Sequence, residues 1–286
     1  MLSLHTNNAA LSAQNSINRT QGSLSTSMTR LSTGYRINSS MDDAAGLQIA
    51  TRLKAQTSGM AVAMRNTQNS TSMLQTAEGA LDEVSNMLVR MKDLATQAAD
   101  ASSTAADKTA MQSEYDALGT ELNNVLNNTT FGGAKLLVGG TIASSMTFQI
   151  GSSTSEKMTV DLSASMTTLG TDVGATTANY AAPNTVGTEL TAAGSASTTI
   201  DKLSTALASI GTVRSALGAS ANRLEHVYNN LSNISTNSKA ATGRIMDVDF
   251  ASESSKMTTN QMLLQAGTAM LKQSNSMSSM VMSLLQ

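Results

Sequence analysis

The sequence predicts a mainly α protein: a long antiparallel helical bundle or coiled-coil rod with a small β-hairpin and paired terminal helices. Three observations lead to this fold class. Apolar residues recur every seven positions over long stretches, which is the spacing of one helix face that packs on another helix. Pro183 is the one proline in 286 residues, so long helices can continue without a break. Strict alternation of apolar and polar residues, typical of strands, is confined to residues 146–162.

The two ends of the chain carry matching amphipathic patterns. The N-terminal pattern consists of Ala10, Ile17, Leu24 and Leu31, with Leu4 and Leu11 as a second seven-spaced pair. The C-terminal pattern consists of Leu263, Met270, Met277 and Leu284, accompanied by Leu264, Leu271, Val281 and Leu285. We expect these two helices to pair with each other. A single pair leaves much apolar surface uncovered, so we expect other copies of the chain to cover the remainder.

This reasoning predicts a subunit interface on the terminal helices. Its expected residues are Leu4, Leu11, Ile17, Leu24, Leu31, Leu263, Leu264, Met270, Leu271, Met277, Val281, Leu284 and Leu285.

Helical spacing continues between the two ends of the chain. A polar connector at 34–43 leads into a long helical pattern from Ala44 to about Ala99, where Leu74, Leu81 and Leu88 are seven apart. A turn and a shorter helix follow, and its apolar residues are spaced 4-3-4-3: Met111, Tyr115, Leu118, Leu122 and Val125.

The chain then changes character. Alternation at Met146, Phe148 and Ile150 and again at Met158, Val160 and Leu162 predicts a hairpin. Residues 163–199 are mostly Ala, Thr, Ser and Gly and are expected to form a surface loop or a small irregular excursion. Helical spacing returns from Ile200 to Leu231, and a second polar connector at 244–250 leads into the terminal helix.

We therefore expect three regions. Residues 1–43 and 245–286 form a terminal helical core domain. Residues 44–165 and 198–244 form a helical bundle with the hairpin. Residues 166–197 form a short surface-exposed loop, and deletion of residues 176–195 is expected to leave assembly intact.

Composition excludes several function classes. The net charge of −2 with no basic run argues against nucleic-acid binding. Cysteine is absent, His5 and His226 are the two histidines, and no HExxH motif occurs, so no catalytic, metal or cofactor site is expected. No 18-residue apolar run predicts a membrane span, and no signal-peptide pattern opens the chain. The 19 methionines are interpreted as flexible core filler.

Several sequence motifs follow one another in a fixed order along the chain. Residues 30–39 (RLSTGYRINS), 42–46 (DDAAG) and 75–81 (QTAEGAL) resemble the N-terminal signature and the next block of the bacterial flagellin family. Residues 130–133 (TFGG) and 135–137 (KLL) resemble a turn in the family. Residues 244–251, 265–267 (QAG) and 283–286 (SLLQ) are similar to its C-terminal signature. The resemblance covers about 1–140 and 200–286; from the residues alone, a junction protein of the same appendage remains the alternative.

The resemblance implies a structural subunit of the extracellular flagellar filament used for motility, in which terminal helices line the core and the bundle forms a shell. The short middle region implies a form without large outer domains. Export by the flagellar type III route is implied, with an export chaperone, the filament cap and hook-junction proteins as further partners. The segment 88–95 resembles one sensed by Toll-like receptor 5, which implies receptor contacts by Arg90, Leu94 and Glu114.

Overall fold

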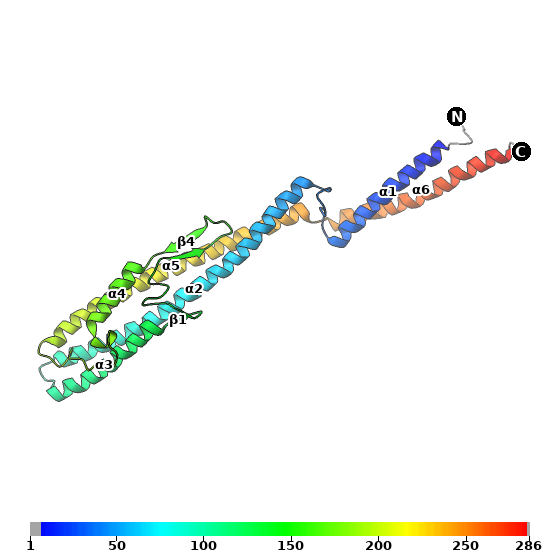
Figure 1. The fold of residues 1–286 in the computed structure, drawn as a ribbon. Helices are drawn as coiled ribbons and strands as arrows, with labels where there is room; N and C mark the ends of the chain where they lie inside the picture. Colours follow the sequence, from blue (N-terminus) through cyan, green and yellow to red (C-terminus); the bar gives the residue numbers. More distant parts are fainter. Residues whose placement is uncertain (1–6, 285–286) are drawn as a thin grey trace. The chain divides into compact units, whose positions relative to one another are not determined.

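The structure, a computed structural model, describes the backbone of residues 7–284 and the side chains of residues 7–277. Its helices are α1 (Asn8–Thr33), α2 (Ala44–Ala99), α3 (Ala105–Asn128), α4 (Ser163–Thr176), α5 (Ser195–Met246) and α6 (Phe250–Leu284), and a 3-10 turn η1 spans Ala178–Tyr180 (Figure 1). The strands form two antiparallel hairpins: β1 (Thr130–Phe131) with β2 (Ala134–Lys135), and β3 (Met146–Gln149) with β4 (Lys157–Val160). The predicted mainly α fold with a small β-hairpin is confirmed.

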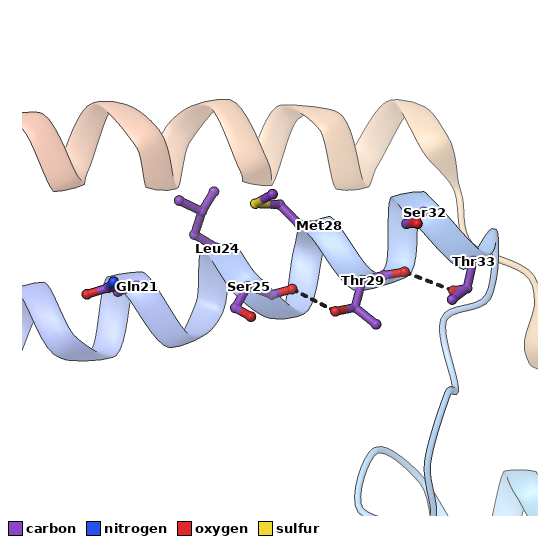
Figure 2. Close-up of a pocket in the computed structure, with 7 residues that line it drawn as sticks. All are labelled: Gln21, Leu24, Ser25, Met28, Thr29, Ser32 and Thr33. Atoms are coloured by element: carbon purple, nitrogen blue, oxygen red, sulfur yellow. Dashed lines mark hydrogen bonds between the residues drawn. The ribbon is translucent and has the colours of Figure 1, made fainter.

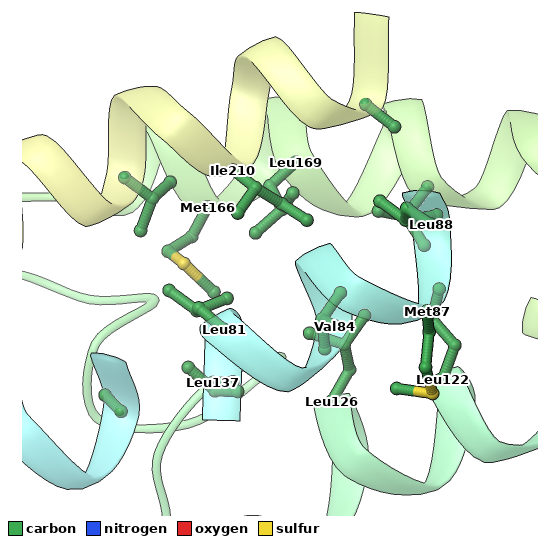
Figure 3. Close-up of a cluster of buried hydrophobic side chains, with 14 of the residues drawn as sticks. Leu81, Val84, Met87, Leu88, Leu122, Leu126, Leu137, Met166, Leu169 and Ile210 are labelled. Carbon is green, nitrogen blue, oxygen red and sulfur yellow. The ribbon is translucent and has the colours of Figure 1, made fainter. Parts of the chain in front are cut away.

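The chain forms two compact units, one of residues 1–57 and 236–286 and one of residues 58–235. In the second unit, the core lies where one face of α2 meets α3, α4 and α5 (Figure 3). Leu81, Val84 and Leu88 follow each other at helical spacing on that face and are fully buried. Aliphatic side chains from the other helices complete the core: Leu122 and Leu126 from α3, Leu169 from α4 and Ile210 from α5.

The hairpin of β3 and β4 covers part of this core. Met146 pairs with Val160, and Phe148 pairs with Met158. Met146, Met158 and Val160 are buried, whereas the intervening Thr147 and Thr159 are exposed. The alternation in the sequence therefore corresponds to a strand pair with one face on the core, as expected.

The structure differs from the expected surface loop at residues 166–197. Its first part belongs to α4, in which Met166, Leu169 and Val173 are buried against the bundle. Three large apolar residues at 3-4 spacing are enough to place a helix once neighbouring helices cover them. Gly174 lets the ring of Tyr180 approach, since a Cβ built there would lie 3.1 Å from Tyr180 Cδ1.

The remainder of that stretch, residues 177–194, is fastened to α3 by polar contacts around Gln112. The Gln112 Nε2 group donates to Asp116 Oδ1 at 2.9 Å and to Glu189 Oε2 at 2.8 Å. Its Oε1 atom accepts from the backbone N–H of Leu190 at 2.7 Å, and the Leu190 side chain is buried. Sequence composition predicted no such attachment, because these contacts join residues that lie more than 70 positions apart.

In the unit of residues 1–57 and 236–286, α1 and α6 run antiparallel, side by side (Figure 1). Gly34 ends α1 with a φ of 76°, a left-handed conformation that glycine adopts without strain. The two connectors then pair, with the Arg36 N–H donating to the Met246 carbonyl at 2.6 Å and the Val248 N–H donating to the Gly34 carbonyl at 3.0 Å. The expected pairing of the terminal helices is confirmed.

Candidate functional site

The terminal helices meet along one face of each. On α6 this face repeats every three or four residues, and all of its members are buried or half-buried: Glu253, Met257, Asn260, Leu264, Gly267, Leu271 and Ser274. On α1 the matching face includes Ala10, Ala13, Ile17, Leu24, Ser27 and Leu31. Seven of these thirteen residues are small or polar, and the six large apolar ones are half-buried rather than buried: Met257, Leu264, Leu271, Ile17, Leu24 and Leu31.

Small residues allow the two helices to come close. Gly267 on α6 lies against Ile17 on α1, and a Cβ built on Gly267 would stand 2.9 Å from Ile17 Cγ1. That distance is too short for two carbon atoms in contact, so any larger residue at this position would push the helices apart.

Two polar contacts join the helices at separate positions along the pair. The Ser27 hydroxyl donates to Glu253 Oε1 at 2.6 Å. Near the other end, Asn7 Nδ2 donates to both the carbonyl and the hydroxyl oxygen of Ser274, each at 3.2 Å. Asn7 also caps α1, because its Oδ1 atom accepts from the Ala10 N–H at 3.1 Å.

Glu253 is a buried carboxylate in this interface, with 4% of its surface exposed. The hydrogen bond from Ser27 lowers the pKa of Glu253, and the positive charges of Lys256 and Arg30 lower it further. Lys256 Nζ lies 3.5 Å from Glu253 Oε2. These partners keep the carboxylate charged where burial alone would favour its protonated form.

A second face of α6 carries large apolar side chains that α1 does not cover. Met262, Leu263, Met270 and Met277 are each more than half exposed. The expected stripe of the C-terminal helix is thus divided: Leu264 and Leu271 face α1, whereas Leu263, Met270 and Met277 do not. On α1, Ile17, Leu24 and Leu31 are half-buried and Leu11 is exposed.

The α1 surface also has a shallow groove of about 540 Å³. Leu24 and Met28 line it together with polar residues: Gln21, Ser25, Thr29, Ser32 and Thr33. Figure 2 shows the hydroxyls of Thr29 and Thr33 turned back onto carbonyls of their own helix, the first onto Ser25 and the second onto Thr29. Leu24 and Met28 are the large apolar side chains that line the groove.

Four of the expected interface residues are not placed by the structure. Leu4 and Leu285 lie outside the described residues, and the side chains of Val281 and Leu284 lie outside the described side chains. Their assignment stays a prediction.

The expected receptor-contact residues lie in the 58–235 unit. Arg90 Nη2 is 2.7 Å and Arg90 Nε 2.8 Å from Glu114 Oε1, and both side chains are about half exposed. Leu94, one turn further along α2, is buried. Arg90 and Glu114 are therefore accessible as a pair, whereas Leu94 packs beneath the surface.

Within the described residues, no group of three or more His, Asp or Glu side chains is placed to hold a metal ion. Over the same part of the chain, every helix is too short or too polar to cross a membrane.

Sequence reasoning missed the polar contacts between the terminal helices. Glu253 shares the helical spacing of Met257, Leu264 and Leu271, so its place on the α1-facing side was visible in the sequence. Its partner Ser27 was not, because nothing local marks which of the many serines of α1 would lie opposite.

Comparison with known proteins gives the family. Residues 4–141 match the family model of the bacterial flagellin N-terminal helical region, and residues 200–285 match that of the C-terminal helical region. The chain is 35% identical to flagellin A of Vibrio anguillarum over 379 aligned residues, covering 100% of both proteins. It is 37% identical to a flagellin of Halalkalibacterium halodurans over 270 residues, covering 94% of each.

Among solved structures, a putative flagellar hook-associated protein from Vibrio parahaemolyticus aligns with a TM-score of 0.58. The alignment covers 72% of this chain and 100% of that one at 17% identity, so it shows a shared fold alone. The two family models and the full-length relatives, in contrast, agree on one family. The chain belongs to the bacterial flagellin family and is a structural subunit of the flagellar filament used for motility, not an enzyme.

Proposed function

We propose that copies of this flagellin contact one another through the terminal helices, on the apolar surface that α1 and α6 leave uncovered. The observation that carries the proposal is the exposed α6 face of Met262, Leu263, Met270 and Met277. A contiguous apolar face on a water-soluble helix is costly unless another surface covers it. Self-assembly of the family makes another copy the natural partner.

Residues 1–43 and 245–286 would then form the inner part of the filament, and residues 44–165 and 198–244 the surrounding shell. Residues 166–197, although folded against α3, would face outward as the short counterpart of a larger outer domain. The unit of residues 58–235 buries its own core, which supports a shell domain that folds without neighbours.

The other proposed partners follow from the resemblance to flagellins. They are an export chaperone, the filament cap and the hook-junction proteins, and the export route is the flagellar type III system, which delivers the chain to an extracellular filament.

Recognition by Toll-like receptor 5 is proposed through the accessible pair of Arg90 and Glu114, with the buried Leu94 packing below them. Arg90→Ala should weaken receptor signalling, whereas Arg214→Ala, which removes the ion pair with Asp82 elsewhere on the unit, should leave it unchanged.

Seeded elongation tests the interface. Ending the chain before Met257 removes most of α6, and we expect a soluble monomer that does not elongate seeds in light scattering or electron microscopy. A finer variant, Leu263→Gln with Met270→Gln, should slow elongation strongly, because it places amides on the exposed apolar face.

The matched control is Gln265→Ala with Lys272→Ala, two exposed positions on a different side of α6. Equal loss of elongation in the control pair, or filaments from the truncated chain, would contradict the assignment.

A further inference from the structure

Among the described residues, the most buried and the most exposed methionines lie in different units. In the 58–235 unit many are buried core residues: Met60, Met87, Met91, Met111, Met146, Met158 and Met166. In the other unit, Met28, Met41, Met262, Met270 and Met277 are each more than half exposed. The interpretation of methionine as core filler suits the first group and does not explain the second.

Exposed methionine is a reactive residue in this chain. The sequence has no cysteine and no tryptophan, so thioether sulfurs are its most readily oxidised side-chain atoms. Oxidation to the sulfoxide turns a flexible apolar side chain into a polar one. Buried sulfurs are shielded from a dissolved oxidant, whereas exposed ones are open to it.

Three of the exposed methionines lie on one face of α6. At about 100° per residue, Met270 is rotated by about 80° from Met262, and Met277 by about 20° from Met270. Leu263 lies about 20° beyond Met270. The α1-facing residues Leu264 and Leu271 lie about 80–100° further round the helix. The three sulfurs are therefore concentrated on the uncovered apolar face rather than scattered over the helix.

We propose that Met262, Met270 and Met277 form an oxidation site through which hydrogen peroxide blocks assembly of the free subunit. Each thioether sulfur takes one oxygen atom from a peroxide molecule and is oxidised by two electrons, and the peroxide is reduced to water. The three sulfoxides place polar groups where a neighbouring copy would need an apolar surface. This inference rests on the proposed role of the α6 face in contacts between copies.

The proposal also predicts that the rate of methionine oxidation differs between the monomer and the filament. In the monomer these sulfurs are exposed, and in a filament the neighbouring copy covers them. Peroxide should therefore oxidise Met262, Met270 and Met277 quickly in monomers and slowly in filaments, while Met41, 95% exposed and in the connector, serves as a reference.

The experiment treats monomers with hydrogen peroxide, locates sulfoxides by peptide mass spectrometry and then measures seeded elongation. We expect sulfoxides at the exposed positions before the buried ones, and elongation slower by about tenfold or more after treatment. The variant carrying Met262→Leu, Met270→Leu and Met277→Leu should keep most of its own untreated rate. Met41→Leu should be as sensitive as the unmodified chain. Loss of the same size in the triple variant would overturn the proposal.

A second measurement needs no substitution. Monomers oxidised to about half occupancy are offered to seeds, and the elongated filaments are separated from the remaining monomer. The filaments should be depleted in sulfoxide at Met262, Met270 and Met277, and not at Met41. Equal sulfoxide occupancy in the two fractions would overturn the proposal.

The rate of oxidation in intact filaments separates this inference from the proposed interface. If the three sulfurs react as fast in filaments as in monomers, the α6 face is not covered and the interface proposal fails with it. If they are protected in filaments but oxidised monomers elongate normally, the interface proposal holds and the oxidation site is overturned.

Discussion

The α2-centred bundle and the α1–α6 pair have the same seven-residue apolar spacing and reach opposite outcomes. In the bundle, Leu81 and Leu88 are completely buried by other parts of the same chain. Among the described residues of α1 and α6, those that reach full burial are the polar Ser27 and Glu253, while Leu263 and Met270 stay exposed. A periodic apolar pattern thus shows that one face of a helix is favoured to pack against another surface. It does not show whether that surface belongs to the same chain. The bundle should depend on its buried core for stability, and the terminal pair on half-buried apolar contacts together with its polar contacts.

The largest expected effect is in the bundle. Leu88→Ala removes a fully buried side chain and should lower the free energy of unfolding of the 58–235 unit by about 3 kcal/mol. Denaturant unfolding followed by circular dichroism measures it. The neighbouring Val89, 47% exposed, is the matched control, and Val89→Ala should change stability by less than about 0.5 kcal/mol. Similar effects of the two substitutions would show that the bundle is not the close-packed region of the molecule.

In the terminal pair, the largest effect should come from Glu253. Glu253→Ala leaves the buried Ser27 hydroxyl without its acceptor and should weaken the α1–α6 contact by about 2 kcal/mol. Faster amide hydrogen exchange in residues 8–33 would report it. Glu253→Gln keeps an acceptor for the Ser27 hydroxyl, so its exchange should be slower than that of Glu253→Ala. Equal exchange rates in the unmodified chain and both variants would show that Glu253 does not stabilise the pair.

The same residue predicts a pH dependence. The folded pair lowers the pKa of Glu253 from its ordinary value of 4.5. Its stabilisation is therefore fully present above pH 4.5 and is lost as the pH falls through the lowered pKa. The protection factors of residues 8–33 against hydrogen exchange should fall over that acid range more in the unmodified chain than in Glu253→Gln. Every other carboxyl group is the same in the two chains, so the difference between them reports the titration of Glu253 alone.

A smaller effect is expected where the helices come closest. Gly267→Ala places a Cβ 2.9 Å from Ile17 Cγ1 and should weaken the pair by about 1 kcal/mol, even though alanine favours a helix. Gly22→Ala, on α1 with no atom within 4 Å of the new Cβ, should be neutral or stabilising. Adding Ile17→Ala to Gly267→Ala should recover part of the loss, because it removes the clashing atom. A stabilising Gly267→Ala would show that the helices have room to separate.

The smallest expected effect is on the surface of the bundle. Arg90→Ala removes the half-exposed ion pair with Glu114 and should change stability by about 0.5 kcal/mol at most, with less effect at high salt. Thermal unfolding at low and high ionic strength checks this. A loss close to that of Leu88→Ala would mean that the pair has a structural role beyond the surface.

Several features of the fold could be predicted from local patterns. The helices at residues 44–99 and 105–128, the hairpin of Met146 and Val160 and the pairing of the terminal helices all follow from spacing and turn residues. Helix α4 could not be predicted in the same way, because its many Thr, Ser and Gly residues have low helix propensity and are common in loops. Deletion of residues 176–195 should expose part of α3, because the buried residues Asn179 and Leu190 bond to Asp116 and Gln112 of that helix.

Within the candidate site, the sequence by itself determined which residues of α1 and α6 share a helix face, because 3.6 residues per turn is a property of the backbone. It also placed Arg90, Leu94 and Glu114 on the two helices that carry them. Tertiary structure alone decided that Leu264 faces α1 while Leu263 does not, that Leu94 is buried, and that Ser27 lies opposite Glu253. These outcomes depend on contacts between distant residues; Ser27 and Glu253, for example, are 226 positions apart. Helical periodicity carries no information about which distant segment will cover a given face.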